Sequence, residues 1–324
     1  MCTAVTYSTR DHYFGRNLDL EYGYRETVTV TPRNFPFHFR RAGAVTNHFA
    51  LIGMATVADG CPLYYEATNE KGLSMAGLNF PGIARYLPEQ PNMVNITPFE
   101  FIPWILGQCE SIEQVCPLLE NINLVDIPFS DALPLSPLHW IIADRERAIT
   151  VEPREDGLKV YENPIGVLTN NPPFDFHLYN LSNFMNVSVD PAENRFSEHF
   201  DVKPFSNGMG GIGLPGDYSS ASRFVRAAFV KLNSVSGCTE EESISQFFHI
   251  LSSVAMPRGP VRMKDDTYEI TRYSCCCNVD RGIYYYTTYE NSRITGVDMH
   301  RENLNGSEPI CYPLVTNQQI RIQN

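Results

Sequence analysis

The first residues of the chain carry the groups that nucleophilic catalysis needs. Cys2 directly follows Met1, and a residue as small as cysteine in the second position normally leads to removal of the initiator methionine. Cys2 then carries a thiol, with an ordinary pKa of about 8.5, and an α-amine, with a pKa of about 7.7–8.0. One residue thus supplies a nucleophile and its general base. Most cysteines at this position have no catalytic role, so a neighbouring segment has to support this interpretation.

That support comes from Phe14–Glu21, which contains two charged residues that can return to Cys2. If the β-like runs on either side of the first turn form a hairpin, Arg16 and Asp19 lie near the start of the first strand. Arg16 favours the thiolate form of the cysteine, and Asp19 accepts hydrogen bonds from the α-ammonium and orients it. The alternative is that Arg16 and Asp19 form an ordinary surface ion pair.

The opening MCTAVTY and the following FGRNLDLEY resemble the start of the choloylglycine hydrolase family. These proteins are N-terminal-nucleophile amidases, and they include bile salt hydrolases, which this chain resembles most, and penicillin V acylases. Further motifs match in the same order along the chain: Asn69–Pro81, Gly166–Pro172, Leu214–Phe224 and Tyr284–Asn291. The resemblance spans nearly the whole chain, and the combination of motifs is specific although each motif alone is weak.

The resemblance assigns roles to six residues: the nucleophile Cys2, and around it Arg16, Asp19, Asn79, Asn170 and Arg223. Attack by sulfur turns an amide carbonyl into an oxyanion, which preorganised donors stabilise by roughly 3 kcal/mol each. The side-chain amide of Asn170 and the backbone N–H near Asn79 suit this task, and Arg223 holds the charge network together. Without the resemblance, Asn170 is a turn residue and Arg223 an exposed helix arginine.

The resemblance also implies a substrate. Asn79 lies in a Gly-Leu-Asn-Phe-Pro motif that bile salt hydrolases tend to share, whereas penicillin V acylases typically have tyrosine there. We therefore expect hydrolysis of glycine- or taurine-conjugated bile salts through a thioester on Cys2, with an apolar pocket for the steroid. The candidate wall residues are Leu18, Tyr24, Ala58, Phe129, Leu133 and Leu138. Val125–Pro137, with apolar residues between prolines, is predicted to be a loop that covers the substrate.

Several alternatives stay open. Each wall residue is equally well explained by ordinary core packing. The nearest functional alternative is an enzyme of the same mechanism that acts on penicillin V or N-acyl-homoserine lactones. From another class, a non-catalytic steroid- or acyl-binding protein would keep the same scaffold, and retention of Met1 would favour it by blocking the amine. Family members that resemble this chain are often homotetramers, so a homo-oligomer is expected.

Composition excludes several classes of partner. The 324 residues contain 25 Lys and Arg against 37 Asp and Glu, a net charge of −12. No run of basic residues indicates nucleic-acid binding, and no run of 18 apolar residues indicates a membrane segment. The nine cysteines are an odd number and no export signal is recognisable, so reduced thiols in a cytoplasmic protein are expected. Because the net charge does not attract an anionic bile salt, binding has to rest on apolar contacts and local arginines.

Neither a metal nor a cofactor is expected. Cys275, Cys276 and Cys277 lie in a β-like run, so neighbouring side chains point to opposite faces and cannot converge on one tetrahedral metal. Buried thiols are the better interpretation. His139 is expected in the core or at a pocket edge, and the glycine-rich run Gly208–Gly213 lacks the lysine of a phosphate-binding loop.

The elements that must position these residues run from strands to helices and back to strands. β-like runs cover residues 3–7, 12–18, 27–31, 50–56, 73–79, 139–144, 148–152, 158–161, 166–169, 268–277, 282–289 and 294–298. Helices are predicted from Thr97-Pro98, over 111–121 and 220–235, and after Thr239, with capping boxes at Ser111–Gln114 and Thr239–Glu242. This order favours one α+β domain over residues 1–324. The resemblance implies the four-layer αββα sandwich of N-terminal-nucleophile hydrolases, in which two stacked, mainly antiparallel sheets lie between helical layers.

Overall fold

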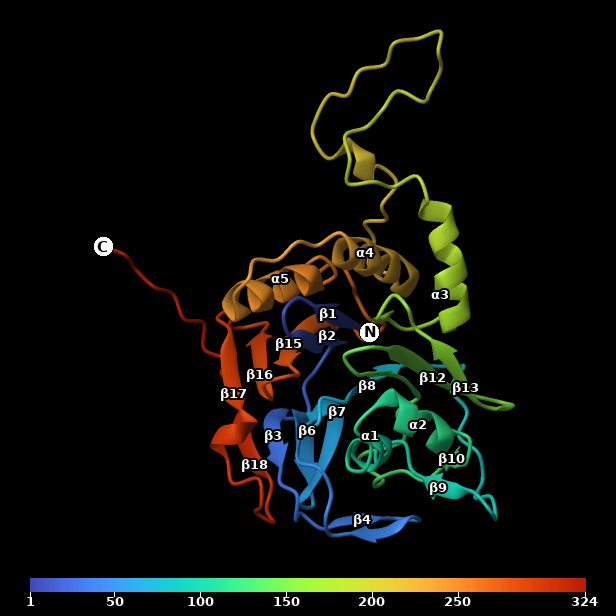
Figure 1. The fold of residues 1–324 in the computed structure, drawn as a ribbon, viewed down its shortest axis with the longest axis vertical. Helices are drawn as coiled ribbons and strands as arrows, with labels where there is room; N and C mark the ends of the chain where they lie inside the picture. The colour runs from blue at the N-terminus through green and yellow to red at the C-terminus, as the bar shows by residue number, and fades with distance from the viewer.

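Two large antiparallel sheets form the centre of the protein, which a computed structural model describes over residues 1–324 (Figure 1). The six-stranded sheet has the order β14-β1-β2-β15-β16-β17. Its strands are β1 (Cys2–Ser8), β2 (His12–Leu20), β14 (Val167–Leu168), β15 (Ile270–Asn278), β16 (Ile283–Thr288) and β17 (Thr295–Asp298). β1 and β2 form the predicted hairpin, and β15 from the last part of the chain pairs with β2.

The eight-stranded sheet has the order β13-β12-β11-β8-β7-β6-β3-β18. Its strands are β3 (Thr27–Thr31), β6 (Leu51–Ala58), β7 (Cys61–Asn69), β8 (Ser74–Asn79), β11 (Leu138–Ala143), β12 (Ala148–Arg154), β13 (Gly157–Glu162) and β18 (Ile310–Pro313). β7 and β18 were not predicted. In β7 the polar residues Glu66, Thr68 and Asn69 are buried. They therefore conceal the alternation of apolar and polar residues that marks a strand.

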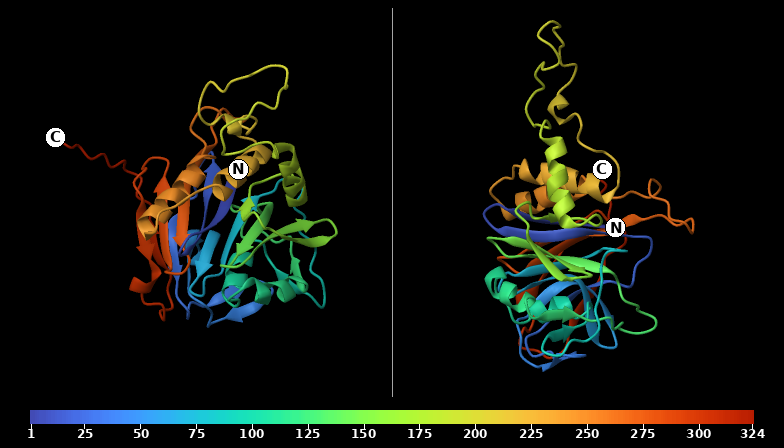
Figure 2. Two further views of the ribbon diagram at one scale, coloured as in Figure 1. Left: turned by 45° about the horizontal axis from the view of Figure 1, so that its top comes forward. Right: turned by 90° about the vertical axis from the view of Figure 1, so that its right-hand side faces the viewer.

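Helices cover the outer faces of both sheets, which gives four layers (Figures 1 and 2). α4 (Ser220–Leu232) and α5 (Glu240–Ser252) pack on the six-stranded sheet, with α3 (Phe174–Asn180) beside α4. α1 (Phe101–Leu106) and α2 (Ile112–Leu119) pack on the eight-stranded sheet. One apolar cluster fills the layers on either side of the six-stranded sheet, and a second lies under α1 and α2. The predicted α+β, four-layer fold is confirmed.

Short elements connect these layers. They are the hairpin of β4 (Phe37–Phe39) and β5 (Gly43–Val45), the parallel pair of β9 (Val94–Ile96) and β10 (Ile122–Leu124), and the 3-10 turns η1 (Leu181–Phe184), η2 (Met209–Gly211) and η3 (Met299–Arg301).

The start of α1 differs from the prediction. The helix begins at Phe101 rather than after Thr97, and the Thr97 N–H donates to the Glu100 side chain at 3.3 Å. Proline has no N–H to donate and fits without penalty in the first turn of a helix. The helix starts late enough that Pro103 falls in its first turn, where a proline is accommodated.

One of the two predicted capping boxes is also wrong. The Ser111 side chain makes no capping hydrogen bond to α2, and Gln114 Oε1 accepts from the Glu110 N–H at 2.8 Å rather than from the Ser111 N–H. The box of Thr239 and Glu242 is present at the start of α5.

An arm formed by the residues between α3 and α4 projects from the body of the protein (Figures 1 and 2). Apart from η1 and η2 it has no regular structure. Phe196, Phe200 and Phe205 expose 85, 67 and 85% of their surface. The arm therefore holds large apolar side chains in water, where they are not stabilised by burial.

Candidate active site

Cys2 is the first residue of β1 and is 3% exposed. It lies opposite Leu18 of β2, and Leu18 lies opposite Tyr273 of β15. Residues directly opposite one another on antiparallel strands share one face of the sheet. The Tyr273 hydroxyl donates to Glu66 of β7, which identifies that face as the one between the two sheets. The Cys2 thiol therefore lies at a strand end, on the face between the sheets.

Arg16 lies on the same face and is completely buried. Its Nη1 donates to the Gly77 carbonyl oxygen of β8 at 2.6 Å, whereas Nη2 has no hydrogen-bond partner. Burial opposes the charge of Arg16, but the nearby Cys2 thiol and the tyrosine and carboxylate groups around it raise the pKa of Arg16 above its ordinary value. The unpaired Nη2 therefore belongs to a firmly charged guanidinium, which suits a thiolate at Cys2.

Glu66 supplies the counter-charge of Arg16, and it was not among the residues predicted from the sequence. Arg16 Nη1 and Glu66 Oε2 are 3.7 Å apart. Two hydroxyls donate to this carboxylate, from Tyr284 at 2.6 Å and from Tyr273 at 2.8 Å. Burial raises the pKa of Glu66, although Arg16 acts in the opposite direction. The only signal in the sequence was an acidic residue within a β-forming run, and it went unused because β7 was not recognised.

Asp19 lies three residues after Arg16 and therefore faces the other side of the sheet, toward α4 and α5. Its Oδ1 accepts from Thr271 Oγ1 at 2.5 Å. Its Oδ2 is 4.0 Å from Arg223 Nη1 and has no hydrogen-bond partner. Arg223 is completely buried in the first turn of α4, and burial lowers its pKa. A buried carboxylate oxygen without a donor is suited to an ammonium group.

Asn170 follows β14 and joins three separate parts of the chain. Its Oδ1 accepts from the Cys2 N–H and from Arg223 Nη2, both at 2.8 Å. Its Nδ2 donates to the Asn79 carbonyl oxygen at 2.7 Å. Arg223 Nη1 also donates to the Cys2 carbonyl oxygen at 2.5 Å. The structure thus brings Cys2, Asn79, Asn170 and Arg223 into one hydrogen-bonded group, although they are far apart in the sequence.

Met1 precedes Cys2 in this structure. Its amine donates to the Asp19 carbonyl oxygen at 2.7 Å and pairs with Glu269. Burial lowers the pKa of the Met1 amine. The Cys2 nitrogen is a peptide nitrogen in this form, and it has no lone pair available to accept a proton. Removal of Met1 converts that nitrogen, which already faces Asn170, into an α-amine.

Two of the six predicted wall residues flank the reactive groups. Leu18 lies opposite Cys2, and Leu138 of β11 lies opposite Asn79 of β8. Leu18 is buried and Leu138 is half-buried. Apolar side chains therefore stand beside both the thiol and the proposed oxyanion site.

The other four predicted wall residues are on loops or at a strand end. The Tyr24 carbonyl oxygen accepts from Thr56 Oγ1 at 3.1 Å, which holds the loop after β2 against β6, whose last residue is Ala58. Phe129 and Leu133 belong to the predicted covering loop, which contains no helix or named strand. The structure thus holds the loop of Tyr24 against the strand that ends at Ala58, and it places Phe129 and Leu133 on a separate loop.

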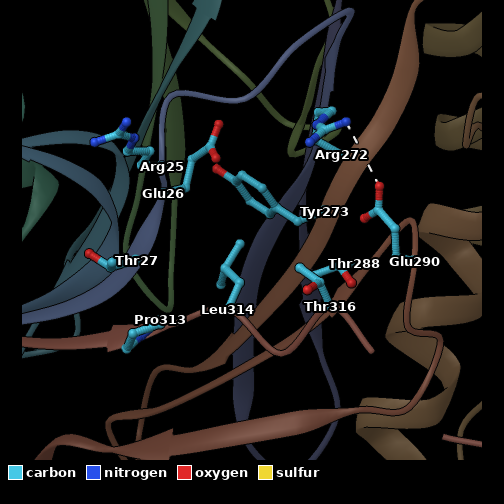
Figure 3. Close-up of a pocket in the computed structure, with 10 residues that line it drawn as sticks. All are labelled: Arg25, Glu26, Thr27, Arg272, Tyr273, Thr288, Glu290, Pro313, Leu314 and Thr316. Atoms are coloured by element: carbon cyan, nitrogen blue, oxygen red, sulfur yellow. Dashed lines mark ion pairs between the residues drawn. The ribbon is translucent and has the colours of Figure 1, made fainter. Parts of the chain in front are cut away.

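A cavity of about 290 Å³ opens two strands away from Cys2, near β15 and β16 (Figure 3). Its walls include the charged residues Arg25, Glu26, Arg272 and Glu290. None of the six predicted wall residues lines it. This polar cavity therefore differs from the apolar pocket that the sequence led us to expect.

The three consecutive cysteines and the histidine singled out in the sequence are buried. Cys275, Cys276 and Cys277 lie in β15 and are inaccessible, as predicted, and His139 is in the core.

No group of three or more His, Cys, Asp or Glu side chains is arranged to hold a metal ion. None of the helices has the length and apolar character needed to cross a membrane.

Comparisons with known proteins agree with the geometry. Residues 2–312 match the family model of the linear amide C–N hydrolases, choloylglycine hydrolase family. The chain is 53% identical over 319 residues, 98% of each chain, to the bile salt hydrolase/transferase of Lactiplantibacillus plantarum. It superposes on the C2A mutant of conjugated bile acid hydrolase from Clostridium perfringens with a TM-score of 0.93, at 38% identity and full coverage of both chains. The penicillin V acylase of Agrobacterium tumefaciens has the same fold, with a TM-score of 0.77 at 18% identity and coverage of 98% of this chain and 93% of that one.

The four-layer fold, with a cysteine at the start of β1 in one of its two stacked sheets, defines the class of N-terminal-nucleophile hydrolases. The chain belongs to the choloylglycine hydrolase family, and it is a hydrolase of linear amide C–N bonds.

Proposed function

We propose that the protein hydrolyses the amide bond of glycine- or taurine-conjugated bile salts and releases the free bile acid and the amino acid. The observation that carries the proposal is the position of Asn170, whose side chain contacts the Cys2 nitrogen, the Asn79 carbonyl and Arg223. This group collects a thiol, the precursor of an amine and an amide donor in one buried site. The relatives named bile salt hydrolase/transferase and conjugated bile acid hydrolase support the choice of substrate.

The reaction requires that Met1 is first removed. The α-amine of Cys2 then lies beside Asn170 Oδ1, and the unpaired Oδ2 of Asp19 is available to its ammonium form. The amine takes the proton of the thiol, as one residue that carries both base and nucleophile can do. The charged Arg16 stabilises the resulting thiolate from the face between the sheets.

The thiolate attacks the carbonyl carbon of the substrate and forms a tetrahedral intermediate. The second N–H of Asn170 Nδ2 and the backbone N–H near Asn79 stabilise its oxyanion. When the C–N bond breaks, the α-ammonium gives its proton to the departing amine of glycine or taurine, and the bile acid stays bound as a thioester on Cys2. Water, deprotonated by the α-amine, then attacks the thioester, and its collapse releases the bile acid and restores the thiol.

Apolar contacts hold the steroid in this proposal. Leu18 and Leu138 lie beside the reactive groups. The loop residues Tyr24, Phe129 and Leu133, together with Ala58, complete the walls when substrate is present. Because the net charge of −12 repels an anion, affinity comes from burial of the steroid rather than from long-range attraction.

We also propose that the chain acts as one domain over residues 1–324 and assembles into a homotetramer in the cytoplasm. The exposed phenylalanines of the arm support assembly, since their burial against another copy would remove a large apolar surface from water. The reaction needs Cys2 as a free thiol, which a reducing compartment preserves. Light scattering of the purified protein measures the mass of the assembly.

The proposal is tested by intact mass and by turnover of glycocholate, taurocholate, penicillin V and an acyl-homoserine lactone side by side. We expect the mass to lack one methionine, and both bile salts to be hydrolysed. Cys2→Ala should abolish turnover and retain the fold by circular dichroism, whereas Cys238→Ala, at an exposed cysteine, should leave turnover unchanged.

Three results would contradict the proposal in different ways. Turnover by Cys2→Ala would exclude the mechanism. Hydrolysis of penicillin V or the lactone without hydrolysis of bile salts would exclude the substrate. A retained Met1, with bile salt bound but not hydrolysed, would support the non-catalytic alternative.

A further inference from the structure

Two buried histidines hold the stretch of backbone that carries Asn170. His177 of α3 donates from Nε2 to the Asn170 carbonyl oxygen at 2.9 Å. His139 of β11 donates from Nε2 to the Thr169 carbonyl oxygen, also at 2.9 Å. Both histidine side chains are completely buried. Two consecutive carbonyl groups are thus held by side chains from two different elements.

Asn170 depends on side chains for its position because strand pairing does not reach it. β14 ends at Leu168, so no ladder of backbone hydrogen bonds extends to Asn170. Its N–H donates to Ser220 Oγ, the first residue of α4, at 2.8 Å. Together with His177, this hydrogen bond satisfies both backbone polar groups of Asn170, as burial requires.

The ring of His177 is itself held in one orientation. It stacks on Phe224 of α4, with ring centroids 4.7 Å apart and an angle of 19° between the planes. Nδ1 has no partner, and burial lowers the pKa of His177 to about 4. The ring is therefore neutral near pH 7, and because Nε2 faces a carbonyl oxygen, Nε2 carries the hydrogen.

His139 connects the two halves of the proposed oxyanion site. Its ring stacks on Phe80, with centroids 4.2 Å apart and planes 6° apart, and Phe80 directly follows Asn79. Its Nδ1 lies 3.3 Å from Glu152 Oε1, which also accepts the N–H of Phe174 at the start of α3. One imidazole thus contacts the chain just before Asn170 and the chain just after Asn79.

We propose that His177 and His139 are positioning residues of the oxyanion site. They hold Thr169 and Asn170 so that Asn170 Nδ2 keeps one hydrogen on the Asn79 carbonyl and directs the other to the carbonyl oxygen of the substrate. The inference rests on the proposed function, which assigns Asn170 to the oxyanion. A misplacement of about 1 Å in such a group is enough to slow a reaction by about 100-fold.

The test compares two replacements of His177. His177→Phe keeps a flat ring against Phe224 but removes the donor, so kcat for glycocholate should fall about tenfold or more while KM changes less than about twofold. His177→Gln returns an N–H at nearly the same place and should recover most of kcat. Equal kcat in wild type and His177→Phe would overturn the inference, and so would a His177→Gln variant as slow as His177→Phe.

His12→Phe is the matched control. His12 is also buried, its Nδ1 is 2.8 Å from Ser8 Oγ, and its pKa is likewise lowered to about 4 by burial. It pairs with Ser8 at the far end of β1, about 20 Å along the strand from Cys2. This variant should lose stability without losing kcat, which separates a general effect of deleting a buried histidine from an effect on Asn170.

Crystal structures of the two His177 variants give a readout that needs no substrate. We expect the Asn170 carboxamide to move away from the Asn79 carbonyl in His177→Phe and to return in His177→Gln. An unmoved Asn170 would overturn the inference even if activity fell. If the wild-type enzyme hydrolyses no bile salt, the proposed function fails, whereas this structural comparison still decides whether His177 positions Asn170.

Discussion

The two faces of the six-stranded sheet each carry one buried arginine and one buried carboxylate beside Cys2, but different atoms are left unpaired on each face. Between the sheets, two tyrosine hydroxyls satisfy Glu66, and Nη2 of Arg16 has no partner. Toward the helices, Arg223 donates to neighbouring oxygens, and Oδ2 of Asp19 has no partner. One face thus has an unused donor and the other an unused acceptor.

This difference matches the two charges that the proposed reaction creates on one residue. A thiolate needs a donor, which Arg16 provides, and an ammonium needs an acceptor, which Asp19 provides. Between the sheets, Glu66 carries the charge opposite to that of Arg16. Toward the helices, Arg223 carries the charge opposite to that of Asp19. The transfer of a proton from the Cys2 thiol to its amine therefore places each new charge next to a prepared partner, which lowers the cost of charge in a buried site.

The largest expected effect comes from the acceptor face. Asp19→Asn should lower kcat for glycocholate by about 100- to 10,000-fold, because the α-amine loses the carboxylate that orients it for proton transfer. Hydrolysis is measured at saturating substrate. Asp11→Asn, at the opposite end of the β1–β2 hairpin and paired with Arg281, should leave kcat unchanged. A loss of less than tenfold in Asp19→Asn would remove the functional distinction between the two faces.

A smaller change in rate but a large change in stability is expected on the donor face. Glu66→Gln removes the counter-charge of the buried Arg16, and breaking a buried ion pair lowers the free energy of unfolding by about 3–5 kcal/mol. Urea unfolding measures this quantity. The matched control is Glu162→Gln, whose ion pair with Arg147 is on the surface and should leave the urea midpoint nearly unchanged. Equal midpoints for wild type and Glu66→Gln would show that Glu66 does not balance Arg16.

The smallest expected effect is on the acceptor face, where the pH dependence of the free energy of unfolding should change. Burial lowers the pKa of His177 from 6.5 to about 4, so the unfolded chain binds a proton more tightly than the folded protein does. The resulting loss in the free energy of unfolding is absent above pH 6.5. It grows as the pH falls and levels off below pH 4 at about 3 kcal/mol. Between pH 7 and pH 4, the free energy of unfolding measured with urea should therefore fall by about 3 kcal/mol less in His177→Phe than in wild type.

His12→Phe should show the same change in pH dependence, because His12 has the same lowered pKa. Only the His177 variant should also lose kcat. If the two variants had equal kcat, then the position of His177 beside Asn170 would have no consequence for the reaction.

The sequence predicted the hairpin of β1 and β2 and the presence of Arg16 and Asp19 beside Cys2. Their location on opposite faces follows from the alternation of side chains in a strand. This alternation does not predict their partners. Glu66 lies 50 residues further along the chain than Arg16, and Arg223 lies 204 residues further than Asp19. Local patterns report which face a residue occupies, but contacts between distant elements depend on how the layers stack.

Two of the elements that were missed share a physical cause. β7 and α3 each place polar residues in the core, Glu66 in the first and His177 in the second. Patterns of apolar and polar residues predict elements by assuming that polar groups face water. A site built from buried polar groups therefore lacks the pattern that would have located it. Only the resemblance to a family brought Asn170 and Arg223 into the site.

The spacing between Arg16 and Asp19 has a consequence for how this sequence can change in length. The interval is odd, so the two residues occupy opposite faces for as long as β2 stays paired with β1 and β15. Insertion or deletion of one residue between them would move both to the same face. We expect the arm between α3 and α4 to tolerate changes in length, because it contributes no strand to either sheet. Whatever side chains these four residues of β2 carry, their number is therefore fixed.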